Sequence, residues 1–151
     1  MLLDCHKFSQ EVLLYSITYV SSATHAFSQE QLFELLDECR SNNLRENLTG
    51  ELLYKDQEFM QVLEGEEEPL KFTFEKICCD KRHKNILILN EGSIGHREFC
   101  DWTMGFYNLD NEYEHHIPGY SDILNYPLTG NEFQSQPSLA QILLLSFKDT
   151  Y

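Results

Sequence analysis

Two polar side chains fall on apolar strand faces, where a hydroxyl or an amide group needs a hydrogen-bonding partner. When alternate residues of 58–65 are counted as a strand, Gln61 shares its face with Phe59. Tyr19 shares a face with Ile17 in the same way on an earlier strand. A buried donor or acceptor without a partner costs about 1–3 kcal/mol. The phenol and the amide must therefore pair with other groups of the fold or with a bound ligand.

A third inward polar group comes from a helix that the sequence predicts between these two strands. Helical spacing from Leu36 and Cys39 reaches Asn43, with Asn42 beside it. A strand, a helix and a second strand are thereby expected to bring a phenol and side-chain amides together. The pattern alone leaves two alternatives open, because these groups can bond one another and the backbone or can bond a ligand.

The elements that position these side chains begin with a strand and a helix. The β-branched and aromatic run 13–21 predicts the first strand. Ser28, with Gln31 three residues later, is a capping box that predicts the start of the first helix. The runs 47–54 and 58–65 then predict an antiparallel hairpin, although its turn lacks the usual glycine.

The second half of the predicted fold adds a helix and two strands. Pro69 is predicted at the first position of the second helix. The continuous apolar run 85–94 is typical of a strand in the middle of a sheet with both faces covered. Alternation along 102–109 predicts a fifth strand. This order predicts an α+β, ferredoxin-like β-α-β-β-α-β-β sheet, mostly antiparallel, with two helices on one face.

The composition of the chain changes after Asp110, and this change suggests a division. Residues 1–110 are expected to form the sheet domain, and residues 111–151 a C-terminal helical extension. Apolar residues recur at helical spacing within 138–148. We expect this segment to pack on the sheet surface that the two main helices leave bare, either as plain core packing or as a relay or dimer contact.

The charge of the chain excludes some classes of partner. The 151 residues include 25 Asp and Glu against 11 Lys and Arg, which gives a formal net charge of −14. Such a charge repels nucleic-acid phosphates and anionic lipid surfaces, so neither nucleic acid nor a membrane is an expected partner. The first residues lack the apolar run of a signal peptide or a membrane anchor. We therefore expect a soluble, cytoplasmic protein.

The cysteines and histidines indicate no metal site. The 5 cysteines are odd in number and have no CxxC spacing, which favours neither a disulfide framework nor zinc. The pair His115 and His116 has no third ligand nearby in the sequence. We expect reduced thiols and no bound metal.

Five stretches of sequence together form a specific pattern. They are ITYVSSAT with Tyr19, SNNLRENLTG with Asn43, FMQVLEGE with Gln61, DKRHKNI with Arg82 and His83, and FCDWTMGF with Trp102 and Met104. With these motifs the chain resembles the BLUF family, the blue-light sensors that use flavin, from about residue 14 to residue 109. The resemblance implies a photoreceptor and not an enzyme, with noncovalently bound FAD, or FMN as the alternative.

The resemblance also implies a role for the three inward polar residues. Tyr19 would give an electron and then a proton to the light-excited flavin, and Gln61 would lie between the Tyr19 hydroxyl and the flavin ring. Asn43 would bond the flavin C4 carbonyl and N3–H, since a side-chain amide offers a donor and an acceptor together. Recombination would leave the Gln61 amide rotated or tautomerised, so the flavin absorption shifts without net chemistry.

Further matched residues would extend this site. Asn42 would reach the neighbouring pyrimidine edge, and Arg82 and His83 would contact the polar edge, the ribityl chain or the phosphate of the flavin. Trp102 or Met104 would carry the change onward along the fifth strand. Without the resemblance, Arg82 and His83 are simple cations at a helix end. Trp102 and Met104 are then ordinary core residues.

The expected output is a signal to a separate, unidentified downstream protein, given by a chain that forms homo-oligomers. Two other classes of function compete with this one. A dark flavoenzyme on the same scaffold needs a substrate acid or base near the flavin, and the sequence offers no such set. A ligand-free, ferredoxin-like interaction module would be colourless when purified.

Overall fold

Five strands form one mixed sheet in a computed structural model, which describes residues 13–99, 103–110, 142–144 and 146–147. The spatial order is β4-β1-β3-β2-β5. β1 pairs antiparallel with β3 and β4, β2 pairs antiparallel with β3, and β5 runs parallel to β2. The strands are β1 (Leu14–Ala23), β2 (Thr49–Lys55), β3 (Glu58–Glu66), β4 (His83–Ile94) and β5 (Gly105–Asn108). The predicted α+β class and element order are confirmed.

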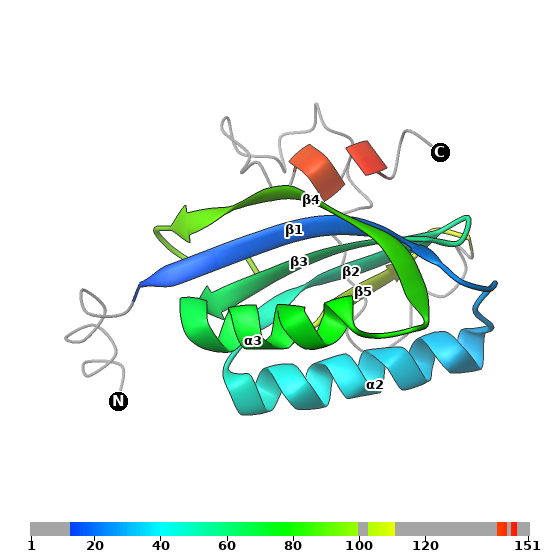
Figure 1. The fold of residues 1–151 in the computed structure, drawn as a ribbon, viewed down its shortest axis with the longest axis horizontal. Helices are drawn as coiled ribbons and strands as arrows, with labels where there is room; N and C mark the ends of the chain where they lie inside the picture. The colour runs from blue at the N-terminus through cyan, green and yellow to red at the C-terminus, as the bar shows by residue number, and fades with distance from the viewer. Residues whose placement is uncertain (1–12, 100–102, 111–141, 145, 148–151) are drawn as a thin grey trace.

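Two helices lie side by side on one face of this sheet, as predicted (Figure 1). They are α2 (Gln29–Glu46) and α3 (Glu67–Cys78). The predicted capping box is present, because the Ser28 hydroxyl accepts from the Gln31 N–H at 3.1 Å and the Gln31 side chain accepts from the Ser28 N–H at 2.9 Å. Within the described residues, no helix is long and apolar enough to cross a membrane.

The predicted position of Pro69 is wrong by two residues. Helix α3 begins at Glu67, directly after β3, so Pro69 is its third residue and not its first. The N–H groups of the whole first helical turn have no partner inside the helix. A proline, which lacks an N–H, therefore fits at the third position as well as at the first.

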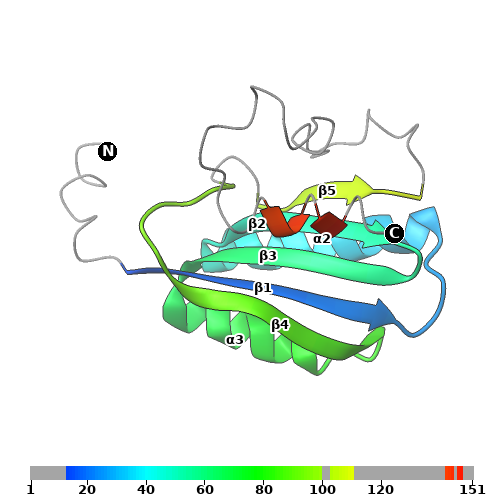
Figure 2. The same ribbon diagram turned by 90° about the horizontal axis from the view of Figure 1, so that it is seen from above.

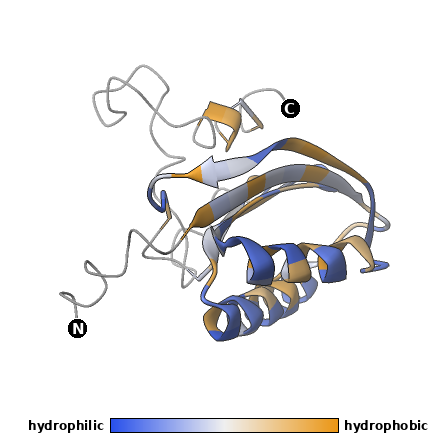
Figure 3. Ribbon diagram, turned by 60° about the vertical axis from the view of Figure 1, so that its left-hand side comes forward, coloured by the Kyte–Doolittle hydropathy of each residue, from blue (hydrophilic) through white to orange (hydrophobic). Residues whose placement is uncertain are grey.

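The main core lies between the sheet and the two helices. In the ribbon of Figure 3, hydrophobic positions (orange) and hydrophilic positions (blue) alternate around both helices. Alternation along each strand decides which residues enter this core. Ile17 of β1, Leu63 of β3 and Leu36 of α2 are all buried in it.

The sheet position predicted for the apolar run 85–94 is wrong. This run forms β4, which is an edge strand beside β1, and its Leu87 is 59% exposed. The centre of the sheet is β3, where seven consecutive residues, Phe59 to Gly65, are buried. An apolar run alone cannot distinguish a covered strand from an edge strand, because the pairing of β1 with both β3 and β4 decides which strand is central.

The predicted fifth strand is present but shorter. β5 spans four residues, and both Met104, which directly precedes it, and Phe106 within it are fully buried. Trp102 lies outside the described residues. Farther along the chain, helical residues at 142–144 and 146–147 lie on the sheet face opposite α2 and α3 (Figures 1 and 2), with Leu144 and Phe147 in the hydrophobic cluster. The division of the chain at residue 110 stays a prediction, since 111–141 are outside the described residues.

The hairpin between β2 and β3 turns without a glycine, and this gives a stability prediction. Asp56 and Gln57 have φ of 51° and 62°, the left-handed values that a two-residue type I′ turn requires. A residue with a Cβ is strained by about 1–2 kcal/mol in this conformation. Glycine relieves the strain, but part of the gain in stability is offset because glycine also raises the entropy of the unfolded chain. We expect Gln57→Gly to raise the free energy of unfolding in urea by about 0.5–1 kcal/mol.

A second glycine variant provides the control for this turn. Lys55→Gly, in the adjoining strand position, is expected to lower the free energy of unfolding. A result in which both glycine variants act in the same direction would contradict the assignment of strain to Gln57.

Candidate functional site

Strand register brings the tyrosine and the glutamine together. Tyr19 of β1 is the direct neighbour of Gln61 on β3, and the Tyr19 hydroxyl donates to Gln61 Oε1. Their side chains are 4% and 2% exposed, respectively. The backbone pairing of β1 with β3 continues before and after these two residues and therefore fixes their relative position. The hydroxyl and the amide meet in a site from which water is largely excluded.

The same amide also contacts the entrance to β5. Gln61 Nε2 points at the sulfur of Met104, at 3.7 Å. Asn43, which is 2% exposed, donates from Nδ2 to the carbonyl of Thr103 at 2.7 Å. Arg40 Nε donates to the Met104 carbonyl at 3.1 Å. Three side chains from two elements thus hold the short segment that leads into β5.

Asn42 links the two helices and is only half-buried. Its Oδ1 accepts from Lys76 Nζ at 2.6 Å and from Arg45 at 3.0 Å. Its Nδ2 donates to the Thr73 hydroxyl at 3.0 Å and lies 3.4 Å from Asn43 Oδ1. The Asn42 amide therefore closes the gap between α2 and α3 next to Asn43.

The two predicted cations after α3 lie at the other end of the same gap. Arg82 donates to both oxygens of Asp80, with a shortest distance of 2.6 Å, and to Glu38 of α2 at 2.7 Å. His83 lies 2.8 Å from the Ser21 hydroxyl through Nδ1 and 2.6 Å from the Ile77 carbonyl through Nε2. Since a carbonyl only accepts, Nε2 carries a proton, and the ring is held in one orientation.

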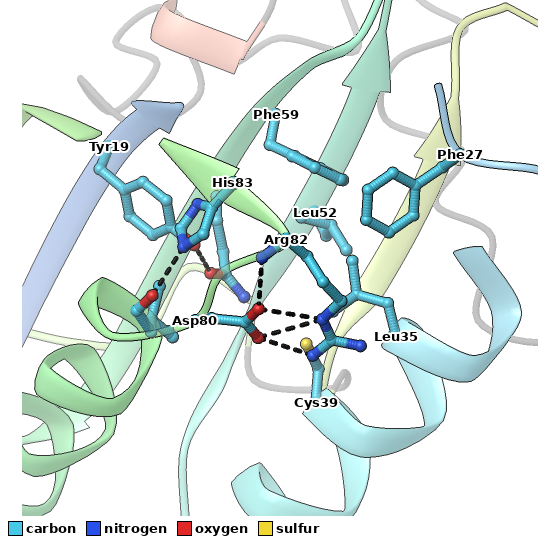
Figure 4. Close-up of a pocket in the computed structure, with 11 residues that line it drawn as sticks. Tyr19, Phe27, Leu35, Cys39, Leu52, Phe59, Asp80, Arg82 and His83 are labelled. Atoms are coloured by element: carbon cyan, nitrogen blue, oxygen red, sulfur yellow. Dashed lines mark hydrogen bonds and ion pairs between the residues drawn. The ribbon is translucent and has the colours of Figure 1, made fainter. Parts of the chain in front are cut away.

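Two adjoining pockets lie between the helices and the sheet. Their shared lining combines apolar and polar side chains: Leu35, Cys39, Gln61, Ile77, Asp80 and Arg82. Figure 4 shows Arg82 and Asp80 of this set near α2, with Tyr19 and His83 on the other side of the pocket.

The pocket fits the flavin that the sequence resemblance implies. A planar aromatic ring needs apolar walls, and Leu35 of α2 and Ile77 of α3 provide them on two sides. The polar edge of a flavin presents carbonyl and N–H groups, which suit the amides of Asn43 and Gln61 at one wall. Of the predicted site residues, Tyr19 and His83 line one pocket, Asn42 and Asn43 line the other, and Gln61 and Arg82 line both. Their contact with a flavin stays a prediction.

Burial sets the protonation state of the groups in the pocket. Burial raises the pKa of Tyr19 well above its usual value, so its hydroxyl stays a neutral donor. Burial likewise raises the pKa of the Cys39 thiol, to about 12. Hydrogen bonding to Arg82 lowers the pKa of Asp80, and the same pairing raises that of Arg82. At neutral pH the pocket holds a neutral phenol, a neutral thiol and the Arg82 guanidinium, which is paired with both Asp80 and Glu38.

The sequence alone missed Asp80 as a site residue. This carboxylate lines both pockets and fixes the Arg82 guanidinium. A carboxylate two residues before an arginine, at the end of a predicted helix, is the local signal that points to it. Leu35 and Ile77 have the helical spacing of ordinary core residues, and their contact with a cavity depends on how α2 and α3 pack.

Comparison with known proteins identifies the family. A sequence model of the family described as sensors of blue-light using FAD (BLUF) matches residues 14–105. Over 107 residues the chain is 32% identical to the photoactivated adenylate cyclase subunit alpha of Euglena gracilis, a match that covers 70% of this chain and 10% of that protein. The chain thus spans about a tenth of the length of that relative.

Two solved structures are similar in fold. A bacterial light-regulated adenylyl cyclase superposes with a TM-score of 0.64 at 36% identity, over 70% of this chain and 31% of the other. BlrB, a BLUF protein in its dark state, superposes with a TM-score of 0.62 at 32% identity, over 66% of this chain and 75% of the other. With its sequence match over 14–105 and this shared fold, the chain belongs to the BLUF family of flavin-binding blue-light sensors.

Proposed function

We propose that this chain binds a flavin between α2 and α3 and reports blue light through the hydrogen bonds of Gln61. The observation that carries the proposal is the buried chain of contacts from the Tyr19 hydroxyl through the Gln61 amide, which lines both pockets, to Met104. The family description favours FAD as the flavin. Chromatography of the flavin released by heat distinguishes FAD from FMN.

Each pocket residue has a role in this proposal. A bound flavin supplies the absorption of blue light and an acceptor for one electron and one proton. Tyr19 is the donor, because its phenol is neutral, buried and bonded to the amide that faces the cavity. Asn43 holds the polar edge of the ring, with Asn42 beside it. Arg82 and His83 hold the more polar part of the flavin at the other end of the pocket.

The Gln61 amide has two orientations of unequal energy. In the orientation present, Oε1 accepts from Tyr19 and Nε2 points at the Met104 sulfur. Turning the amide by a half rotation puts Nε2 opposite the Tyr19 oxygen and Oε1 opposite a sulfur, which is only a weak acceptor and no donor. In the turned orientation Nε2 can donate to the Tyr19 oxygen, but the Tyr19 O–H loses its acceptor, which costs about 1 kcal/mol net. A light-driven change in the bonding of Tyr19 is therefore enough to shift this balance.

The signal leaves the site through the segment that leads into β5. Asn43, Arg40 and Gln61 all contact residues 103 and 104, so a rotated amide changes the contacts of Met104 first. A near-complete conformational switch needs about 5.5 kcal/mol of bias, whereas one redirected hydrogen bond supplies about 1 kcal/mol. We propose a modest shift of population, read by a separate protein partner and reinforced by association of several copies of the chain.

The proposal predicts a coloured protein with a reversible response. The purified protein is expected to be yellow, and blue light is expected to shift its flavin absorption slightly to the red, with full return in the dark. Absorption spectra before, during and after illumination measure this, and free flavin under the same light is the control. A colourless protein would indicate a ligand-free module, and a bleached flavin band would indicate electron transfer without the Gln61 switch.

A further inference from the structure

A second buried polar group lies on β3, on the opposite face from Gln61. Glu64 is three residues farther along the strand, so its side chain points away from the helices. It is 1% exposed. Its Oε1 accepts from the N–H of Phe99 at 2.7 Å and from the Thr49 hydroxyl at 3.1 Å, and its Oε2 accepts from the N–H of Glu98 at 2.8 Å. Hydrogen bonds of this length to a carboxylate are among the stronger ones in proteins.

Arg97 adds further bonds to the same segment. Its guanidinium donates to the carbonyl of Asn47 at 2.8 Å, to the Thr49 hydroxyl at 2.9 Å and to the backbone carbonyl of Glu64 at 3.2 Å. Burial raises the pKa of Glu64, and the three donors and the Arg97 charge act against that rise. The segment 97–99 is therefore fastened to β3, to the start of β2 and to the residue that caps α2.

Segment 97–99 lies in the connection between β4 and β5, and the residues that contact the pocket side chains lie in the same connection. It follows β4, and the chain reaches Thr103 and Met104 four to five residues later. Those two residues take the hydrogen bonds of Asn43, Arg40 and Gln61. Residues 97–99 of the connection between β4 and β5 are thus held by Glu64 and Arg97, and residues 103–104 by Gln61 of β3 and by Asn43 and Arg40 of α2.

We propose that Glu64, together with Arg97, is a positioning residue that fixes 97–99 on β3, so that a change at Gln61 moves Met104 against an immobile end of the connection. This inference rests on the proposed photoreceptor function and adds the residue that couples the pocket to its output. With the start of the connection released, residues 103–106 would sample several arrangements in the dark and in the light. The structural difference between the dark and the light state that a partner could recognise would then be lost, although the flavin absorption would still shift.

The test compares Glu64→Gln with Glu58→Gln in the flavin-loaded protein. A glutamine keeps the shape of Glu64 but turns an NH₂ group toward one of the two backbone N–H donors. Glu58 lies on the same face of β3 and accepts from the Ser22 hydroxyl at 2.9 and 3.1 Å, and in the described part of the chain its carboxylate forms no hydrogen bond to 97–99. Absorption spectra record the red shift, and NMR records amide hydrogen exchange in the dark and under blue light.

We expect Glu64→Gln to keep a red shift of wild-type size. Amide exchange at Glu98 and Phe99 should accelerate by about tenfold, as expected for the loss of a charge-assisted hydrogen bond. The light-dependent difference in exchange at residues 104–106 should be lost. Glu58→Gln should keep the red shift, the slow exchange of 98 and 99, and the light-dependent difference.

Several outcomes would overturn the inference. A light-dependent difference at 104–106 that persists in Glu64→Gln overturns it while the photoreceptor function stands. So does a loss of the red shift itself in that variant, because Glu64 would then act on the flavin pocket. A wild-type protein with a red shift but no light-dependent exchange at 104–106 also overturns it, and a wild-type protein without any red shift removes the photoreceptor function as well.

A second variant covers the case in which Glu64→Gln does not fold. Arg97→Gln leaves the carboxylate and its two backbone bonds in place and removes the side-chain bonds to Asn47 and Thr49. It is expected to accelerate exchange at 98 and 99 and to reduce the light-dependent difference at 104–106, with an unchanged red shift. An undiminished difference at 104–106 in Arg97→Gln overturns the inference.

Discussion

Replacing Tyr19 by phenylalanine is expected to abolish the light-induced red shift while the flavin stays bound. The phenyl ring keeps the edge contact with Phe74, whose ring centroid is 5.4 Å away, so the wall of the pocket keeps its shape. The hydroxyl that donates to Gln61 Oε1 is removed, and with it the electron and proton donor of the proposed switch. Absorption spectra of the dark and illuminated variant measure the loss, and the dark spectrum reports the retained flavin.

A second tyrosine on the same strand is the matched control. Tyr15 shares the strand face of Tyr19, but its hydroxyl donates to Glu91 at 3.2 Å in an exposed position. Tyr15→Phe is expected to keep the full red shift, since it removes a hydroxyl that the pocket does not use. An undiminished shift in Tyr19→Phe would refute the proposed donor role, and so would a loss of the shift in both variants.

The elements of this fold were predictable where nearby side chains decide the structure. The capping pair Ser28 and Gln31 lies three residues apart, and the helix begins where this pair predicts it. The hairpin turn was located correctly even without a glycine, because the strand patterns on both sides of Asp56 and Gln57 are clear. Local backbone preferences and the alternation of apolar and polar residues were thus sufficient to predict the order of helices and strands.

The position of β4 was not predictable, because it depends on pairing between distant residues. Its apolar run matches a covered strand, yet β1 inserts between β3 and β4 and leaves β4 at the edge. The contacts of the connection after β4 are equally nonlocal. Asn43 bonds a carbonyl 60 residues away, and Glu64 an N–H 35 residues away. Periodicity predicted that Asn43 points inward, but no local pattern names such a partner.

The chemistry of the site came from two sources. Alternation and helical spacing delivered Tyr19, Gln61 and Asn43 as inward polar residues, and the structure places each of them in or beside one cavity. The same polar groups also bond one another and the backbone, so burial alone would not require a ligand. The flavin was inferred from the family resemblance, and the pockets between the helices and the sheet are where we propose that it binds.

Replacing Gln61 by leucine is expected to remove the red shift and to lower stability together. Leucine keeps an apolar contact with Met104 but leaves the buried Tyr19 hydroxyl without its acceptor. That loss should lower the free energy of unfolding in urea by about 1–3 kcal/mol. The illuminated spectrum should then show no red shift, because no amide remains to change its bond to the flavin.

Met104→Leu tests the Nε2 contact of the Gln61 amide separately from its Oε1 contact. This variant removes the sulfur that Nε2 approaches at 3.7 Å and keeps the tyrosine bond to Oε1. Because sulfur is a weak acceptor and the side-chain volumes are similar, Met104→Leu should keep the red shift and cost less than about 1.5 kcal/mol of stability. If Gln61→Leu retained the shift and Met104→Leu lost it, the switch would lie at the sulfur and the proposed role of the amide would be wrong. The opposite pattern assigns the response to the tyrosine side of Gln61 and leaves Met104 to carry it toward β5.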